Sequence, residues 1–350
     1  MTTVEHSQQL ECDTNPPRPP NVLVSAGWSL FESFFSSGLR SRLTGMCKWQ
    51  RDSARTPTAP FRRKLAFADA LLTTWDSPRF GDNLMEMAPK LRFIGHCGGE
   101  VKSRFAASLF DKLTITNAAD PMARATAELG AAFLAYCARD IDRYRAAMRR
   151  SNRIFSEVHE HGTEEFLYGR EVAMIGFGRV GRALVDLMRG FDLHWIVYDP
   201  YAACSLADSY PIAFCELEPL LRKAHLLILT AALTDQTRGL LNRKTLALLP
   251  KGATVINIAR GGLIDLRALT AEVRRKRLCC ALDVTDPEEP LSVNHPLRKL
   301  PGAILTPHIG GGGCHVRQRI AETVMNDLES FFAGKPVRNR VTRAMLERMT

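Results

Sequence analysis

The sequence predicts an α/β protein with a doubly wound parallel sheet, and three observations lead to this fold class. Short apolar segments alternate with helical patterns from residue 21 onward. A G-x-G-x-x-G run at 176–181 stands between an apolar segment and a helical one. The chain has 350 residues, 45% of them hydrophobic and 24% charged, which suffices for two domains with cores of their own.

The first block of elements occupies the N-terminal third of the chain. A helix is expected over 31–43, and strands are expected at 21–26, 70–75, 91–95 and 113–116. A long helical stretch then begins near Pro121, a favourable first helical residue, and ends near Glu157. Because this stretch separates two α/β blocks, we expect a domain boundary there.

The second block has the clearer pattern. A helix is expected over 180–188, directly after the glycine run. Buried strands are expected at 170–175, 193–198, 225–230, 254–258, 280–284 and 303–306. Strands that alternate with helices at this spacing are typical of a doubly wound parallel sheet.

No part of the sequence suggests a membrane or secreted protein. No apolar run approaches the roughly 18–20 residues that cross a bilayer, and the first residues lack the apolar segment of a signal peptide. Residues 1–20 end in a proline-rich run, which predicts a disordered tail. The nine cysteines are scattered without metal-ligand spacing, so we expect no metal site and a reduced, cytoplasmic location.

The charge balance raises the question of an acidic partner. The formal net charge is +10, from 47 Lys and Arg against 37 Asp and Glu. A basic surface attracts nucleic acids or small anions. Basic residues cluster at 139–153 and 274–277, and such runs are more often a solvated face. We therefore expect no nucleic-acid partner.

The glycine run has the features of a dinucleotide-binding turn. Gly176 allows the tight turn, Gly178 allows a diphosphate to approach the backbone, and Gly181 allows close packing of helix on strand. The helix that starts here offers free N–H groups to phosphates. Asp199, 18 residues after Gly181, ends the next strand and is placed to accept a hydrogen bond from a ribose 2′-hydroxyl.

The residues around this acid bear on the choice of dinucleotide. The Asp199 carboxylate would repel a 2′-phosphate, and Pro200 and Tyr201 supply no cation to compensate. NAD is therefore favoured over NADP. Arg179 offers a cation for a phosphate contact and leaves the choice open to that extent.

Four candidate catalytic residues come shortly after predicted strands: Arg260, Glu288, Glu289 and His308. The carboxyl ends of parallel strands form the ligand-binding edge of such sheets. An arginine clamps a carboxylate and polarises a carbonyl, a histidine moves a proton, and an acid orients the histidine. Taken singly, each residue also fits a surface ion pair or a loop cap. Together, downstream of a dinucleotide motif, they suit the reduction of a 2-oxo acid by a nicotinamide.

In this combination the chain resembles the NAD-dependent D-2-hydroxyacid dehydrogenase family. The likeness rests on GFGRVG at 176–181, TDQTRGLLNRKTLALLPKGATVINIARGGLID at 234–265, LDVTDPEEPLSVNHPL at 282–297 and TPHIGG at 306–311. It covers nearly everything after residue 20. The resemblance implies that Arg260, one of Glu288 and Glu289, and His308 are catalytic.

The resemblance also implies an architecture and a set of cofactor contacts. A Rossmann-type NAD-binding domain over 121–309 would be inserted into a smaller, flavodoxin-like substrate domain made of 21–120 and 310–350. The protein would form a homodimer through its cofactor domain, and its cleft would close by domain motion. The expected cofactor contacts are Gly176, Phe177, Gly178, Arg179, Val180, Gly181, Asp199, Thr230, Ala231, Ile258, Ala259, Asp283, His308 and Gly310.

The acid loop departs from the family pattern by one extra residue. Counting from Asp283 favours Glu288 as the partner of the histidine, whereas the adjacent Pro290 and the spacing from Arg260 favour Glu289. Both remain candidates.

The substrate loop departs more. It reads HCGGEVK over 96–102 in place of a G-x-G-x-D pattern. The backbone N–H groups of Gly98 and Gly99 are expected to bind the substrate carboxylate together with Arg260. Glu100 would oppose an anionic substrate unless it is turned away or balanced by Lys102. In addition, Ala231-Ala232 replaces a proline-containing pair, a mild change at the edge of the cofactor site.

The expected function is hydride transfer between NAD(H) and a D-2-hydroxy acid/2-oxo acid pair, with glyoxylate, hydroxypyruvate or a related 2-oxo acid as substrate. Both candidate acids are glutamates, which argues against the formate dehydrogenases of the superfamily, and the chain ends before the regulatory domain that phosphoglycerate dehydrogenases often append. The alternative is an NAD-sensing, corepressor-like binding protein on the same fold. A third candidate, an enzyme for a non-carboxylate substrate, is disfavoured by Arg260.

Overall fold

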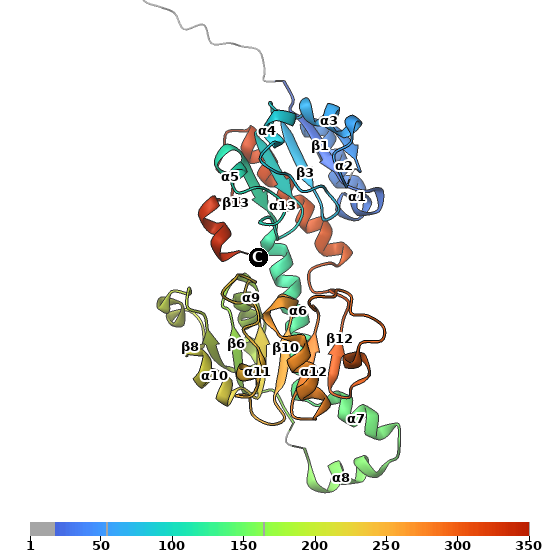
Figure 1. Ribbon diagram of the computed structural model, residues 1–350, viewed down its shortest axis with the longest axis vertical. Coiled ribbons are helices and arrows are strands. Elements are labelled where there is room, and N and C mark those ends of the chain that lie inside the picture. The colour runs from blue at the N-terminus through green and yellow to red at the C-terminus, as the bar shows by residue number, and fades with distance from the viewer. Residues whose placement is uncertain (1–17, 54, 164, 350) are drawn as a thin grey trace, which may run out of the picture.

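The computed structural model describes residues 18–53, 55–163 and 165–349. They form two α/β halves, one above the other in Figure 1, each built around a sheet. The six-stranded sheet has the order β13-β5-β4-β3-β1-β2, and the seven-stranded sheet has the order β12-β11-β10-β9-β6-β7-β8. All pairs are parallel except β13 with β5. The predicted fold class is confirmed.

The strands lie close to their predicted positions. The first sheet contains β1 (Asn21–Ser25), β2 (Lys48–Asp52), β3 (Ala70–Thr73), β4 (Phe93–His96), β5 (Thr114–Asn117) and β13 (Arg340–Val341). The second contains β6 (Glu171–Ile175), β7 (His194–Tyr198), β8 (Ile212–Phe214), β9 (Leu226–Leu229), β10 (Thr254–Asn257), β11 (Cys279–Leu282) and β12 (Ala303–Leu305). Three edge strands, β2, β8 and β13, were not predicted from the sequence. They are short or polar because only one side of each is paired.

The helices cover the sheets and link the two halves. They are α1 (Trp28–Phe34), α2 (Ser37–Met46), α3 (Ala59–Ala66), α4 (Leu84–Met87), α5 (Leu109–Lys112), α6 (Ala119–Ala138), α7 (Ile141–Met148), α8 (Arg153–His161), α9 (Arg179–Leu187), α10 (Leu217–Lys223), α11 (Arg243–Leu246), α12 (Leu266–Arg274) and α13 (Cys314–Phe332). Two predictions about helices were wrong in detail.

The single helix expected over 31–43 is broken into α1 and α2. The Ser36 side chain accepts a hydrogen bond from Leu39 N–H and so starts a second helix. The long stretch expected over 121–157 consists of α6, α7 and α8. It breaks first after α6, where Asp140 takes the left-handed conformation with φ +44°.

The core of the larger half lies on both faces of its sheet. Every residue of β9 and β10 is buried. Leu229 and Val255 pack on one face, while Ile228 and Ile256 pack on the other. Burial on both faces explains why β9 is a continuous apolar run, L-L-I-L, and why the middle of β10 is apolar.

The chain passes between the halves twice, so that both chain ends contribute to the smaller one. It leaves through α6, which packs on α9, and returns before α13, which packs against α1 and β4. The boundary at 121–309 stays a prediction. Most of the tail expected over 1–20 lies outside the described residues, and Arg18, at its described end, forms an ion pair with Asp69 at 3.1 Å. Among the described helices, none is both long and apolar enough to cross a membrane.

Candidate active site

The glycine turn after β6 has the shape that the motif predicts. Gly176 has φ +91°, and a Cβ there would lie 2.4 Å from the Cα of Ala231. A Cβ on Gly181 would lie 2.9 Å from the carbonyl oxygen of Gly176. Gly178 caps α9 and has open space where a side chain would stand. The helix start is therefore accessible to a phosphate group.

Other predicted cofactor residues lie in this turn, against it, or in the core of the same half. The Phe177 side chain is buried against Tyr210. Thr230 donates a backbone hydrogen bond to Ile175 and a hydroxyl hydrogen bond to Gly176. Val180 is half-buried in the first turn of α9, Ala231 is half-buried beside the turn, and Ile258 is buried.

Asp199 follows β7 and organises the loop beside the glycine turn. Its two oxygens accept hydrogen bonds from the backbone N–H groups of Phe177, at 2.7 Å, and Tyr201, at 2.9 Å. A carboxylate has lone pairs left for a further donor such as a ribose hydroxyl. Arg179 is engaged elsewhere, because its Nε lies 2.8 Å from Asp120 Oδ1 at the start of α6.

Asp283, at the end of β11, positions the histidine. The residue is only 2% exposed. Its carboxylate accepts three hydrogen bonds, from Thr306 Oγ1–H at 2.6 Å, Ile309 N–H at 2.8 Å and Gly310 N–H at 2.9 Å. Its carbonyl accepts the N–H of His308 at 2.9 Å. His308 has φ +55°, a conformation that needs such support. The hydrogen bonds of Asp283 therefore hold the backbone turn that carries His308.

The histidine and one of the two candidate acids are in contact. Glu289 Oε1 lies 2.8 Å from His308 Nδ1, and both side chains are about half exposed. Glu288 instead accepts a hydrogen bond from Ser292 N–H at 3.1 Å. Of the two alternatives left by the extra loop residue, the geometry pairs Glu289 with His308.

Arg260 follows β10 at the carboxyl edge of the larger sheet. Its Nη1 donates a hydrogen bond to the carbonyl of Ala259 at 2.7 Å. Burial lowers the pKa of Arg260, and the charges of Glu100 and Glu289 act in the opposite direction. Because an arginine stays protonated in proteins, Arg260 is a half-buried cation, and the negative charges of Glu100 and Glu289 act on it.

Asn257, which was not among the predicted site residues, holds the backbone around this arginine. Asn257 is fully buried at the end of β10. Its Nδ2 donates to the Arg260 carbonyl at 2.9 Å, and its Oδ1 accepts the Ala259 N–H at 3.0 Å. The signal that could have found it is an asparagine inside an otherwise apolar strand, V-I-N-I, because a buried amide requires such partners.

The substrate loop differs from its prediction at one glycine. Gly98 N–H donates to the carbonyl of His96 at 2.8 Å, so it is engaged within the loop. The N–H of Gly99 has no protein partner among the described residues, and its carbonyl accepts Asn117 Nδ2–H at 2.7 Å. The Glu100 carboxylate accepts hydrogen bonds from the N–H and hydroxyl of Ser103. It is thus turned toward its own loop, and Lys102 is exposed.

The space under Gly98 is filled by two nitrogen-bearing rings. A Cβ on Gly98 would lie 2.5 Å from His96 Nε2 and 2.9 Å from Trp75 Nε1. His96 is fully buried, and its Nδ1 lies 2.9 Å from Thr73 Oγ1. Burial, with a smaller contribution from the charge of Arg104, lowers the pKa of His96 to about 3. His96 is therefore a neutral support of the loop at physiological pH.

Comparisons with known proteins agree on a family. The model of the D-isomer specific 2-hydroxyacid dehydrogenase, NAD binding domain, matches residues 131–310. The glyoxylate reductase of Pyrococcus horikoshii is 30% identical over 305 residues, which cover 85% of this chain and 89% of that protein. The D-3-phosphoglycerate dehydrogenase of Methanocaldococcus jannaschii is 30% identical over 281 residues, 79% of this chain but 52% of that protein.

Solved structures share the fold of this chain. The TT0316 protein of Thermus thermophilus matches with a TM-score of 0.70 and 28% identity, over 92% of this chain and 100% of that one. A phosphoglycerate oxidoreductase from Rhizobium etli, 23% identical, matches with a TM-score of 0.76, over 92% of this chain and 98% of that one, and supports the fold.

Proposed function

The chain belongs to the D-isomer-specific 2-hydroxyacid dehydrogenase family, and from this premise we propose that it transfers a hydride between NAD(H) and a D-2-hydroxy acid/2-oxo acid pair. In this proposal His308 is the acid/base, Glu289 is its partner and Arg260 binds the substrate carboxylate. The single observation that carries it is the 2.8 Å contact between Glu289 Oε1 and His308 Nδ1. The charge of Glu289 also acts on the half-buried Arg260.

The residues of the glycine turn fit a nicotinamide dinucleotide. Gly176 leaves no room for a Cβ, while Gly178 leaves the start of α9 uncovered. Backbone N–H groups at this start would bind the diphosphate, and Asp199 would accept a hydrogen bond from the ribose. When bound, the nicotinamide supplies or accepts the hydride.

The remaining steps belong to the chain's own residues. The Arg260 guanidinium would hold the substrate carboxylate through two parallel hydrogen bonds, with the Gly99 N–H as a further donor. Since His308 Nδ1 faces Glu289, its Nε2 is the nitrogen that faces the substrate oxygen and gives it a proton during reduction. Glu289 would hold the ring in that orientation and stabilise the imidazolium before the proton leaves.

The direct test is NADH oxidation at 340 nm by the purified protein with glyoxylate, hydroxypyruvate, pyruvate, phenylpyruvate and 2-oxoisocaproate. We expect turnover with at least one small 2-oxo acid. Tight NADH binding without turnover on any of them would contradict the proposal and favour the corepressor-like alternative.

Two neighbouring glutamates allow a matched test of the proton relay. Glu289→Gln is expected to lower kcat by about 10²-fold, because an uncharged amide cannot stabilise the imidazolium. Glu288→Gln removes the same charge one residue away, where the side chain bonds Ser292, and is expected to leave kcat within about twofold. Steady-state kinetics over a pH range should show an altered pH profile of kcat for Glu289→Gln and an unaltered profile for Glu288→Gln. Equal losses in the two variants would remove Glu289 from its assigned role.

We further propose that the protein forms a homodimer through the hairpin of α7 and α8. The hairpin projects from the larger half, away from the smaller one (Figure 1), and neither helix has a buried residue. Helices of 8 and 9 residues are too short to be stable alone in water. The hairpin therefore needs a covering surface, and the family resemblance makes a second copy the occupant we choose.

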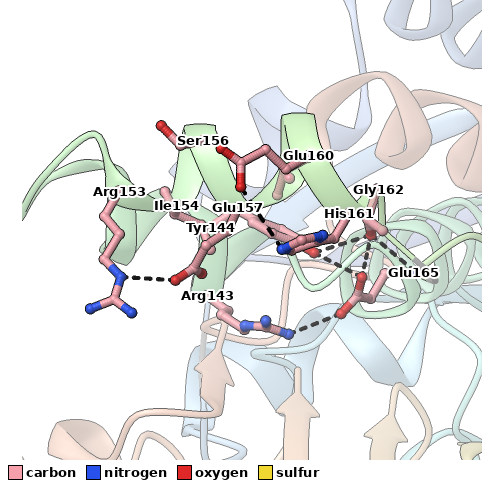
Figure 2. Close-up of a pocket in the computed structure, with 12 residues that line it drawn as sticks. Arg143, Tyr144, Arg153, Ile154, Ser156, Glu157, Glu160, His161, Gly162 and Glu165 are labelled. Carbon is pink, nitrogen blue, oxygen red and sulfur yellow. Dashed lines mark hydrogen bonds and ion pairs between the residues drawn. The ribbon is translucent and has the colours of Figure 1, made fainter.

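The surface of the hairpin offers an apolar groove beside a polar cavity. The groove, of about 380 Å³, is lined by Tyr144, Met148, Ile154, Phe155, Val158 and His159. The neighbouring cavity of about 710 Å³ is bordered by ion pairs of Arg143 with Glu165 at 2.9 Å and of Arg153 with Glu157 at 3.0 Å (Figure 2). An apolar centre with a charged rim is the usual composition of a protein interface.

Phe155→Asp is expected to convert the dimer to a monomer, because a charge would replace an apolar side chain in the groove. Sedimentation velocity measures the change. Phe67→Asp is the matched control, since both phenylalanines are 64% exposed but Phe67 lies on the other half. A Phe155→Asp protein that sediments like the wild type would reject the hairpin as the interface.

A further inference from the structure

The C-terminal segment of the smaller half reaches the cofactor-binding half. After β13 the chain forms a 3-10 helix, η5 (Arg343–Arg348), which is anchored in the smaller half by the buried Leu346 and by an ion pair between Arg343 and Asp111 at 2.7 Å. At its end, the Arg348 guanidinium lies over the ring of Tyr201, 5.3 Å from the ring centroid. In Figure 1 the C-terminal end lies between the two halves.

Tyr201 belongs to the loop of the ribose-binding acid. Its N–H donates to Asp199 Oδ1 at 2.9 Å, and its hydroxyl donates to Gln236. The acid at the end of this strand is the one that meets the adenosine ribose in dinucleotide-binding folds. The last residues of the chain therefore bring a guanidinium to the adenosine end of the cofactor site, 149 positions along the sequence from Asp199.

Apart from its contact with the Tyr201 ring, this guanidinium forms no ion pair with the described residues. Among the described residues, no carboxylate lies within ion-pair distance of Arg348, whereas Arg343 of the same helix is paired and Arg179 at the start of α9 is paired with Asp120. The Asp199 carboxylate, in turn, already accepts two backbone N–H groups that offset part of its charge. The net charge at the adenosine end of the cofactor site is therefore more positive than the sequence around Asp199 implies.

We propose that Arg348 binds the 2′-phosphate of NADPH and lets the protein use NADPH alongside NADH. This inference rests on the proposed use of a nicotinamide dinucleotide. A planar guanidinium forms paired, charge-assisted hydrogen bonds with phosphate oxygens. NADH has a hydroxyl at the same position and gains little from the cation, so Arg348 acts on the ratio of the two affinities.

The test measures binding of each reduced dinucleotide to the full-length protein without substrate, by fluorescence titration. For Arg348→Ala we expect the Kd of NADPH to rise about tenfold and the Kd of NADH to stay within about twofold, because one exposed charge-assisted pair to phosphate is lost. Arg348→Lys keeps the positive charge but not the planar guanidinium with its paired donors. Its Kd for NADPH is expected to lie between those of the wild type and Arg348→Ala. Arg319→Ala, which removes an exposed arginine of α13 on the same half, should leave both constants unchanged.

Three outcomes would overturn the inference: a wild type that does not bind NADPH, an Arg348→Ala variant with unchanged NADPH affinity, or a parallel loss for both dinucleotides. The last would mean that the segment only shapes the site. A wild type that binds neither dinucleotide would reject the cofactor assignment itself. Thermal melting of each variant separates a loss of binding from a loss of folding.

Discussion

Replacing His308 by alanine is expected to lower kcat by about 10³-fold and to leave NADH binding unchanged. The reason is that the proton for the substrate oxygen comes from this imidazole, and a positioned general acid contributes about 10²–10⁴-fold. The side chain is about half exposed, so its removal leaves no large cavity in the core. Steady-state kinetics with the best 2-oxo acid, together with NADH titration, measure the two quantities separately.

His315→Ala is the control for this experiment. His315 is an exposed histidine in the first turn of α13, seven positions from His308 along the chain, and its loss should leave kcat unaltered. An active His308→Ala protein would exclude this residue as the acid. A variant that loses both turnover and NADH binding would instead point to a collapse of the turn held by Asp283.

The second large effect is expected for Arg260→Ala, with kcat/KM for a 2-oxo acid reduced by about 10²–10³-fold. Removing one partner of a hydrogen-bonded, partly buried charge pair costs about 3–4 kcal/mol of transition-state binding. The loss should appear in both KM and kcat, because the arginine holds the carboxylate and also polarises the carbonyl. Arg260→Lys should recover only part of it, since an ammonium cannot form the paired hydrogen bonds.

Arg275→Ala provides the matched loss of one arginine on the same half. Arg275 is exposed beyond the end of α12 and pairs with Glu272 on the surface. Its removal should change kcat/KM by less than about twofold. If Arg260→Ala and Arg275→Ala proteins had similar kcat/KM values, Arg260 would have no part in substrate binding.

The fold could be predicted from the sequence where burial leaves a clear pattern. The central strand β9 is apolar at every position, and β10 is apolar in its middle, because both faces of these strands are covered. The glycine turn is recognisable because a side chain at Gly176 would collide with Ala231. The edge strand β2 is K-W-Q-R-D, with no residue fully buried. Such a strand depends on its pairing with β1, which no local pattern encodes.

The candidate site was predictable to the same degree. Arg260 and His308 follow recognisable strands, so their place at the carboxyl edge of the sheet could be inferred. The choice between Glu288 and Glu289 could not, because one extra loop residue makes the two ways of counting disagree. The path of the loop decides it by turning Glu288 to Ser292 and Glu289 to His308.

The class of fold, the dinucleotide turn and the types of residue at the active edge are encoded locally, because they depend on backbone conformation and on the period of apolar residues. Which side chains meet depends on how the chain packs. This packing directs the Asp283 carboxylate to the backbone of Ile309 and Gly310, places Asn257 behind Arg260, and brings Arg348 to Tyr201 from the opposite half. These contacts join residues that strand order and loop paths bring together, and hydrogen bonds and ion pairs depend on distances of a few ångströms that sequence spacing does not specify.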